Sequence, residues 1–117
     1  ADLAVTNGGT MINSNGEKGE KETFGKRASW IDFYGKRGEK MEGMAILQHP
    51  SNEWYPAPWF TRDYGFFSPT PMYWPANDKE TTLKKGQVIK LKYRVLVHSG
   101  DTSNAKIAEH FEKYKSE

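Results

Sequence analysis

All six prolines of the chain lie in one segment, residues 49–75, together with more than half of its aromatic residues. Proline fixes its own φ at about −65° and pushes the residue before it toward extended conformations. The segment therefore cannot form a regular helix, and we expect a long, rigid loop. A structureless loop of this length is uncommon in a compact domain and is more often functional than ornamental.

The aromatic side chains of this segment have two interpretations. Trp54, Trp59, Phe66 and Phe67 either close the open end of a β-sheet core or contribute rings to a ligand surface. Flat apolar rings with a polar tip suit a ligand that has an apolar face and hydroxyl edges, as a sugar ring does. A carbohydrate or another small polar ligand is therefore the expected partner if the rings line a site.

Composition limits the other classes of partner. The chain has 117 residues, enough for one domain with a modest core. It has no cysteine, which excludes disulfides and thiolate metal sites. Its net charge is +2 with both signs interleaved, a pattern that does not indicate nucleic-acid binding. No apolar run approaches the length of a membrane-spanning helix, about 18 residues.

Short apolar and alternating runs predict strands. Residues 28–35 and 41–49 are expected to form an antiparallel hairpin, with 44–47 either a strand covered on both faces or a short buried helix. Residues 86–100 alternate along their length, which predicts one long strand whose odd-numbered apolar residues face the core. The first 27 residues are expected to form a short strand, a turn and a solvated, charged loop.

A helix is expected to close the chain. Asp101 or Thr102 can cap it. Its apolar residues share one face: Ile107, Phe111 and Tyr114. The predicted fold is mainly β, an antiparallel β-sandwich with a long proline-rich and aromatic loop and one C-terminal helix, in a single domain over residues 1–117.

Polar residues that could carry chemistry cluster in or beside the loop. His49 could act as a general base, Asp63 could orient it or act as an acid, and Arg62 could hold a carboxylate or an oxyanion. Alternatively, Arg62 and Asp63 fasten the loop to other parts of the chain. The charged run that contains Glu20 and Lys26 is either a solvated loop or a source of acid and ammonium groups for a cleft.

No cofactor or metal site is predicted. The three histidines lack the short spacing of a zinc site, and no phosphate-binding glycine loop occurs. A non-haem iron site formed by His49, His98 and Asp63 stays open as an alternative, because such a site needs two histidines and a carboxylate. Otherwise His98 is expected on the polar face of its strand and His110 in solvent.

Three blocks carry a resemblance to a known family. They are "EKETFGKRASWID", "HPSNEWYPAPWFTRDYG" and "LKKGQVIKLKYRVLVHSGD", in this order, within a match from about Gly9 to about Tyr114. The chain resembles the C-terminal part of a family of secreted bacterial proteins of unknown function, often labelled methane-oxygenase PmoA-like. The resemblance implies a sandwich-like β architecture, a secreted or periplasmic location and an association with carbohydrate breakdown.

The resemblance also implies that residues 1–117 correspond to the C-terminal part of a larger family domain, because family members are typically much longer; the chain is then a fragment, a partner of another chain or a shortened relative. Methane oxidation is not carried over, since the membrane subunit of such an enzyme must span a bilayer. The central block matches the family at His49, Asn52, Trp59, Arg62, Asp63 and Tyr64. The first block matches it at Glu20, Lys21, Glu22, Lys26 and Arg27.

Two functions follow as hypotheses. In the first, a carbohydrate-binding or carbohydrate-active β-sandwich stacks a sugar on Trp54 and Trp59. The residues that orient or activate the sugar are His49, Arg62 and Asp63, and those that complete its binding are Asn52, Tyr64, Glu20 and Lys26. In the second, a non-catalytic structural or interaction module completes a β-sheet with a partner chain, with a missing N-terminal half or by self-association, because an exposed strand edge is a ready template.

Overall fold

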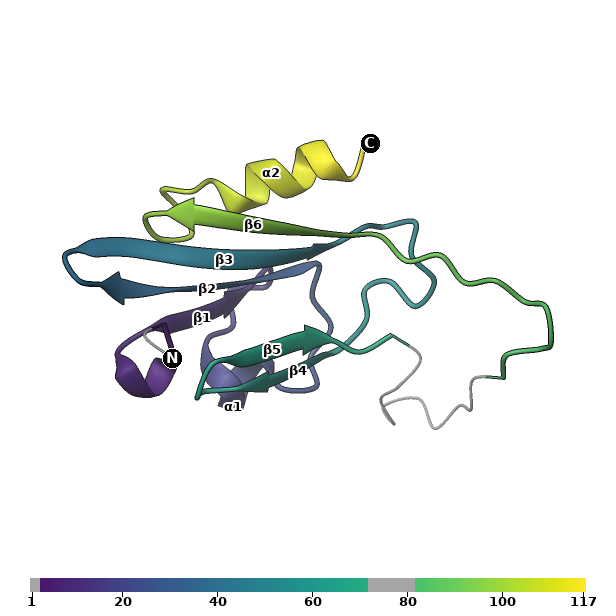
Figure 1. Ribbon diagram of the computed structural model, residues 1–117, viewed down its shortest axis with the longest axis horizontal. Coiled ribbons are helices and arrows are strands. Elements are labelled where there is room, and N and C mark those ends of the chain that lie inside the picture. The colour runs from purple at the N-terminus through teal and green to yellow at the C-terminus, as the bar shows by residue number, and fades with distance from the viewer. Residues whose placement is uncertain (1–2, 72–81) are drawn as a thin grey trace.

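The computed structural model describes residues 3–71 and 82–117. The described chain forms three layers: a C-terminal helix, a four-stranded antiparallel sheet and a two-stranded antiparallel sheet (Figure 1). The elements, in chain order, are η1 (Val5–Asn7), β1 (Thr10–Asn13), α1 (Gly19–Thr23), β2 (Trp30–Arg37), β3 (Lys40–Gln48), β4 (Trp59–Arg62), β5 (Phe66–Pro69), β6 (Tyr93–Ser99) and α2 (Ile107–Tyr114). The fold is therefore mainly β with a C-terminal helix, as the sequence predicts.

The four-stranded sheet has the order β1-β2-β3-β6, and every neighbouring pair is antiparallel. Its centre is the hairpin predicted from residues 28–49. Strands β2 and β3 pair along their whole length, with Trp30 opposite Leu47 at one end. The turn between them uses Gly38 at φ +67°, a left-handed conformation that glycine adopts without a steric penalty. Strands β1 and β6 are left as the two edges.

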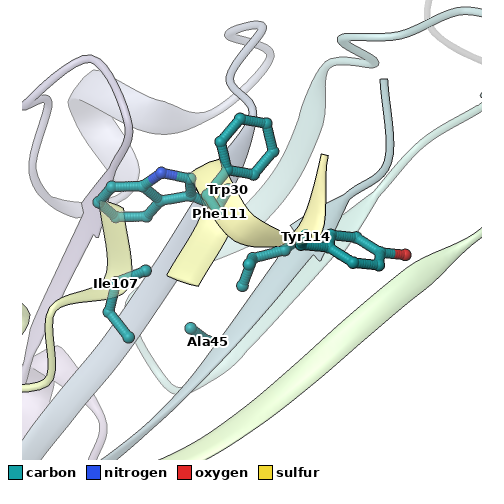
Figure 2. Packing of buried hydrophobic residues seen from close by; sticks show 6 residues of the cluster. Trp30, Ala45, Ile107, Phe111 and Tyr114 are labelled. Carbon is teal, nitrogen blue, oxygen red and sulfur yellow. The ribbon is translucent and has the colours of Figure 1, made fainter. Parts of the chain in front are cut away.

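Helix α2 packs against one face of this sheet (Figure 2). The predicted helix face is confirmed, because its three apolar residues are all buried. The buried cluster on this side contains Trp30, Ala45, Leu47, Ile107, Phe111 and Tyr114. Leu96 of β6 packs against the same cluster, so α2 covers the β3 and β6 side of the sheet.

The start of α2 differs from the expected cap. The N-cap residue is Lys106 at φ +56°, rather than Asp101 or Thr102. Asp101 Oδ1 accepts the Asn104 main-chain N–H at 2.8 Å and so closes the turn before the helix. The Thr102 hydroxyl donates to a carboxylate of the sheet, at Asp32. Both polar side chains therefore have partners other than the helix N-terminus.

The β4–β5 hairpin covers the opposite face over β1 and β2. The buried cluster on this side contains Met11, Ala28, Ile31, Phe33 and Trp59. Trp59 is fully buried, and its indole N–H donates to the main-chain oxygen of Ala28 at 2.8 Å. Two separate cores, one on each face of the same sheet, therefore hold the molecule together.

This hairpin corrects the expectation of one long loop over residues 49–75. Within that segment β4 and β5 pair along four residues, with Trp59 opposite Pro69. Proline is tolerated there because Pro58 precedes β4 and Pro69 ends β5, outside the interior of a sheet. Residues 49–57 and 70–71 match the predicted irregular loop, while residues 72–75 lie outside the described residues.

Strand β6 is shorter than predicted, and its faces are reversed. It begins at Tyr93, so residues 86–92 are not part of the strand. Its odd-numbered apolar residues are exposed, whereas its even-numbered residues face α2 and are half-buried. Strict alternation defines the period of a strand but not the face that meets the core. Here the helix covers the more polar of the two faces.

Two smaller expectations are partly confirmed. In β3, Ala45 and Leu47 are buried under α2, but Met44 on the other face is 37% exposed, so this strand is not covered on both faces. The predicted short strand near the N-terminus is present as β1. The charged run after it is not a solvated loop throughout, because part of it forms α1.

Candidate functional site

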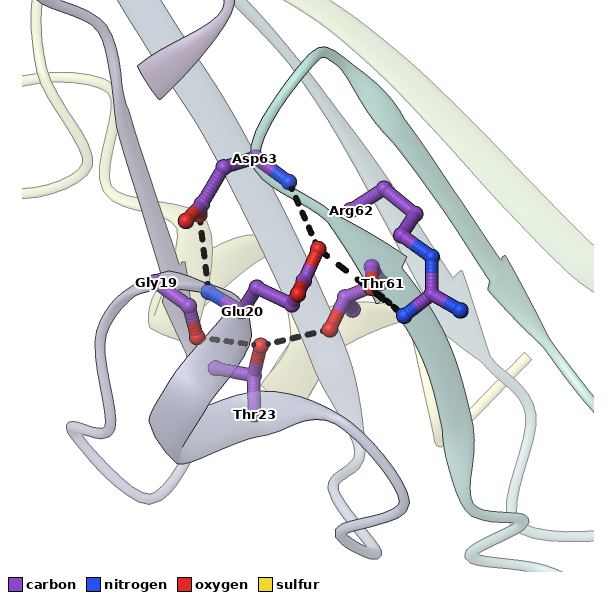
Figure 3. A network of polar contacts seen from close by, with 6 residues as sticks. All are labelled: Gly19, Glu20, Thr23, Thr61, Arg62 and Asp63. Atoms are coloured by element: carbon purple, nitrogen blue, oxygen red, sulfur yellow. Dashed lines mark hydrogen bonds and ion pairs between the residues drawn. The ribbon is translucent and has the colours of Figure 1, made fainter. Parts of the chain in front are cut away.

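The charged run and the central motif meet at one end of the β4–β5 hairpin (Figure 3). Asp63 Oδ1 accepts the main-chain N–H of Glu20 at 2.9 Å, and Glu20 Oε1 accepts the main-chain N–H of Asp63 at 3.2 Å. Arg62 Nη1 lies 3.8 Å from the same Glu20 oxygen. The structure therefore brings together three predicted site residues that come from separate blocks of the sequence.

Two buried hydroxyl groups extend this network. Thr23 Oγ1 donates to the main-chain oxygen of Gly19 at 2.6 Å and lies 2.9 Å from Thr61 Oγ1. Because the Thr23 proton is already used, the Thr61 hydroxyl donates in the second contact. Both side chains are fully buried, so their hydrogen bonds join α1 to β4 inside the protein. The network thus fastens the helix to the hairpin, as the structural interpretation of Arg62 and Asp63 expects.

Aromatic rings surround Arg62. Its guanidinium carbon lies 4.7 Å from the ring centroid of Phe24 and 4.5 Å from that of Phe60. The Phe60 ring meets Phe24 and Phe66 edge to face, with centroids 5.2 Å and 5.7 Å apart. We call Phe24, Phe60, Arg62 and Phe66 the aromatic–arginine cluster. Since Phe66 is 47% exposed, the cluster presents apolar ring surface and a cation to solvent.

His49 lies in a different set of contacts. Its Nδ1 accepts the Ser51 main-chain N–H at 3.1 Å, and its Nε2 lies 3.0 Å from the main-chain oxygen of Glu117. Because Nδ1 is an acceptor, the neutral ring carries its proton on Nε2 and donates it to Glu117. The ring is buried and meets Tyr114 edge to face, with centroids 4.9 Å apart. Both ring nitrogens are therefore used within the protein.

Asn52 fastens the loop to the segment that precedes β6. Its Nδ2 donates to the Lys92 main-chain oxygen at 2.8 Å, and its Oδ1 accepts the Lys92 main-chain N–H at 2.7 Å. The side-chain amide thus takes the place of a neighbouring strand for Lys92. The main-chain N–H of His49 donates to the same Lys92 oxygen at 3.1 Å. These contacts are structural, because the Asn52 amide uses one N–H and its oxygen to pair with the Lys92 backbone.

The remaining predicted ligand residues differ in access to solvent. Trp59 is fully buried in the hairpin core and cannot stack on a ligand, which corrects its expected role. Trp54 is half-buried at φ +68°, an uncommon backbone conformation for a large side chain. Tyr64 is 65% exposed in the turn between β4 and β5, and Lys26 is also exposed. Trp54 and Tyr64 are the rings of the predicted set that can reach a ligand.

The predicted catalytic set divides into two groups. Arg62 and Asp63 bond to Glu20, whereas His49 contacts Ser51, Tyr114 and Glu117. In residues 3–71 and 82–117, no hydrogen bond, ion pair or ring contact joins the two groups. A general base acts within hydrogen-bond reach or through one water. The geometry therefore gives no support to joint action of His49 with Arg62 and Asp63.

A buried carboxylate–imidazole pair was not expected from the sequence. Asp32 on β2 is fully buried, and its Oδ1 lies 2.5 Å from His98 Nε2 on β6. Its Oδ2 accepts the Thr102 hydroxyl at 2.6 Å. His98 Nδ1 is buried without a hydrogen-bond partner in the described part of the chain. The pair corrects the expectation that His98 lies on a solvent-facing strand surface.

The space for this imidazole is provided by a glycine in the neighbouring strand. A Cβ at Gly43 would come within 2.6 Å of His98 Cε1. Gly43 lies directly opposite His98 in the β3–β6 register, so the ring rests on its backbone. A glycine inside a strand marks the close approach of another group. That glycine, together with an aspartate between apolar residues in β2, is the sequence signal that could have revealed the pair.

The iron site that was left open is not formed. In the part of the chain that the structure describes, no group of three His, Asp or Glu side chains is placed to hold a metal ion. His49 and His98 bond to different partners, and Asp63 bonds to Glu20. The two histidines and the carboxylate therefore do not converge.

In the described residues, 3–71 and 82–117, nothing packs over half of the sheet face opposite α2. The β4–β5 hairpin lies over β1 and β2, but on β6 Val95 is 56% and Val97 is 83% exposed. Val95 pairs with Ile46 and Val97 with Met44, so these side chains form one continuous apolar surface. We call this surface the open half. Its exposed residues are Met44, Tyr93, Val95 and Val97, and it is bordered by Ile46, which is half-buried and also packs against the cluster under the hairpin.

The sequence model of one family, described as "Family of unknown function (DUF6807)", matches residues 1–112. The chain belongs to this family. No curated protein and no solved structure matches it. In this DUF6807 chain the first and central blocks of the resemblance meet in the bonds between Glu20 and Asp63, and the third block supplies β6.

The DUF6807 family is described as one of unknown function, so the geometry of the site is what indicates a function. Within the described residues of this DUF6807 protein, no helix is long and apolar enough to cross a membrane. Among the described residues, two of the surfaces that present apolar side chains to solvent are the open half and the aromatic–arginine cluster. They lie on different elements and support different functions.

Proposed function

We propose that the chain is an interaction module whose open half is covered by a β-layer of a partner. The observation that carries this proposal is the 83% exposure of Val97 in a strand whose other face packs against α2. A large contiguous apolar patch on the surface of a soluble protein usually marks an interaction site. Single exposed apolar residues would need no such explanation, but the residues of the open half adjoin one another.

The covered half of the same face supports the proposal. There Ile31 and Phe33 are buried, because the β4–β5 hairpin packs over them. The hairpin is two strands wide and the sheet four, so among the described residues the second layer stops halfway across. Sheets of a sandwich pack about 10 Å apart. A partner sheet beside the hairpin would therefore lie at the same distance from the four-stranded sheet as the hairpin does, and would continue the sandwich.

The edge of the sheet supports it as well. In the described strands β6 is the last of its sheet, so its outer backbone groups have no neighbouring strand. Natural edge strands are usually protected by lysine, proline or a bulge. On the open half, however, β6 presents only Tyr93, Val95 and Val97. The surface therefore lacks the charges that would keep a partner away.

Photo-crosslinking from single positions tests the proposal. A benzophenone amino acid is placed at Val97, in the open half, or at Val88, which is 76% exposed but outside it. In cells that make the protein, we expect a specific adduct from position 97 and none from position 88. The adduct should be lost when Val95→Thr is added. Equal labelling from both positions, or none from position 97, would show that the proposal is wrong.

A second proposal is that the aromatic–arginine cluster, together with Tyr64, binds a carbohydrate. It is supported by the exposure of Tyr64 in the hairpin turn and of Phe66 at the start of β5, next to Arg62 and Asp63. Of the two Asp63 oxygens, only Oδ1 accepts a hydrogen bond from the described residues. Its other oxygen could accept a sugar hydroxyl while the rings take the apolar face of the sugar.

Heteronuclear NMR titration with a panel of oligosaccharides tests this second proposal. We expect shifts confined to the hairpin turn and α1, and at least a tenfold weaker affinity in Tyr64→Ala and Phe66→Ala, roughly the effect of one stacking ring. Leu83→Ala changes an exposed apolar residue elsewhere and serves as the control. Shifts that are absent, or that are unaffected by both turn variants, would rule the site out.

A further inference from the structure

We infer that the partner of the open half is a second copy of this chain, packed face to face about a two-fold axis parallel to the strands. This inference rests on the proposed function, because it names the partner of the same surface. Most soluble oligomers are symmetric, and a two-fold contact uses the same patch on both copies. The patch must therefore be complementary to itself in shape and in charge. The elements around it must also leave room for the second copy.

The strand register gives the apolar complementarity. In the sheet, Val97 lies opposite Met44 and Val95 lies opposite Ile46. A two-fold axis that runs between β3 and β6 sets β6 of one copy over β3 of the other. Val97 then meets Met44 of the second copy, and Val95 meets its Ile46. Each contact occurs twice, and all of these side chains are apolar.

The charges permit this packing. The open half contains no Asp, Glu, Lys, Arg or His, so two copies bring no like charges together at its centre. The nearest charge on the same face of β3 is Glu42, two residues before Met44. Its carboxylate lies 3.9 Å from Arg37 Nη1 of its own chain. A charge that is already paired at the rim opposes self-association only weakly.

The position of the β4–β5 hairpin selects the direction of the axis. If the axis ran within the interface but perpendicular to the strands, β1 and β2 of the second copy would overlap the hairpin of the first copy. An axis parallel to the strands instead places them beyond β6, on the side away from the hairpin. The hairpin of the second copy then lies beyond the edge of β6. A single symmetric contact therefore covers the exposed face and also shields the terminal strand.

Sedimentation velocity over a range of concentrations tests the self-association. We expect the parent chain to form a dimer, and the double variant Val95→Thr/Val97→Thr to weaken its dissociation constant by at least about tenfold, because hydroxyl groups would be buried without partners. The matched control Val88→Thr should leave the dimer unchanged. Far-ultraviolet circular dichroism of the double variant should match the parent, because both substituted side chains are exposed in one copy and the fold of each copy should not change.

Isotope-filtered NMR on a mixture of labelled and unlabelled chains tests the geometry. We expect contacts between the Val97 methyl groups of one copy and the Met44 methyl group of the other. A dimer whose copies instead pair through the β6 backbone would overturn the face-to-face arrangement. A monomer at every concentration, with a crosslink from position 97 to a different protein, would overturn the second copy but leave the proposed function standing. A monomer without any such crosslink would overturn both.

Discussion

The imidazole of His98 and the carboxylate of Asp32 meet across the sheet, with Nε2 and Oδ1 2.5 Å apart. The contact passes over β3 and joins β2, inside the sheet, to β6 at its edge. Asp32 is fully buried, and a buried carboxylate is tolerated only when it is paired and hydrogen-bonded. The pair therefore anchors the strand that presents the open half.

Removal of either partner should destabilise the protein. Asp32→Ala leaves the Thr102 hydroxyl and the His98 ring without their acceptor, and His98→Ala leaves the carboxylate with the hydroxyl alone. We expect each to lower the free energy of unfolding by about 3–5 kcal/mol in urea denaturation. The double variant should cost less than the sum, by about 0.5–3 kcal/mol. His110→Ala, on the exposed side of α2, should change stability by about 0.5 kcal/mol or less. Strict additivity of the two single variants would show that they do not interact.

His49 should contribute to stability rather than to chemistry. The ring is buried, bonds to Ser51 and Glu117 through its two nitrogens, and packs on Tyr114. His49→Ala leaves a cavity and removes the partner of the Ser51 main-chain N–H and of the Glu117 main-chain oxygen, which together should cost about 1–3 kcal/mol. Thermal unfolding followed by circular dichroism measures the loss. An unchanged midpoint would return His49 to the candidates for a catalytic role.

The Glu20–Asp63 contact should depend on main-chain hydrogen bonds more than on charge. Asp63→Ala removes the acceptor for the Glu20 N–H at the start of α1, and we expect a loss of about 1 kcal/mol, as for a helix cap. Glu20→Gln keeps an oxygen for the Asp63 N–H and loses only the exposed ion pair with Arg62, which should cost about 0.5 kcal/mol or less. Urea unfolding of both variants makes the comparison. If Glu20→Gln cost more than Asp63→Ala, the ion pair would be the dominant contact.

Stability should fall at alkaline pH because of two tyrosines. Burial raises the pKa of Tyr114 above its usual value of 10.0, and Arg94 opposes this only in part. Burial likewise raises the pKa of Tyr93. A raised pKa means that the folded protein favours the neutral phenol. The stabilisation is therefore complete below pH 10 and is lost as the pH rises through the folded pKa values. Urea midpoints measured from pH 8 to pH 11 should fall less in Tyr93→Phe/Tyr114→Phe than in the parent, and an identical fall would contradict the assignment.

The sequence was sufficient for the elements whose patterns are local. The β2–β3 hairpin and the buried face of α2 follow from turn residues and from the spacing of Ile107, Phe111 and Tyr114. Alternation in β6 was also correct, but a period of two is equally consistent with either face as the buried one. The face that is covered depends on the position of α2, and the alternation within β6 gives no information about that position.

The polar contacts were harder to predict, because they join residues far apart in the chain. Asp32 and His98 are 66 positions apart, and their contact exists only because β3 separates β2 from β6 by one strand. Trp59 was expected in a loop, but its register in β4 turns it into the hairpin core. The carbohydrate ligand, the secreted or periplasmic location and the larger family domain stay predictions.

The unequal width of the two sheets has a practical consequence for anyone who produces this protein. The residues left uncovered in a single copy, Val95 and Val97, lie in a stretch of high β-propensity, which is the type of segment that drives aggregation during expression and storage. Threonine at both positions keeps the β-propensity and leaves both cores untouched. These two substitutions should therefore raise the concentration at which the purified chain can be kept and crystallised.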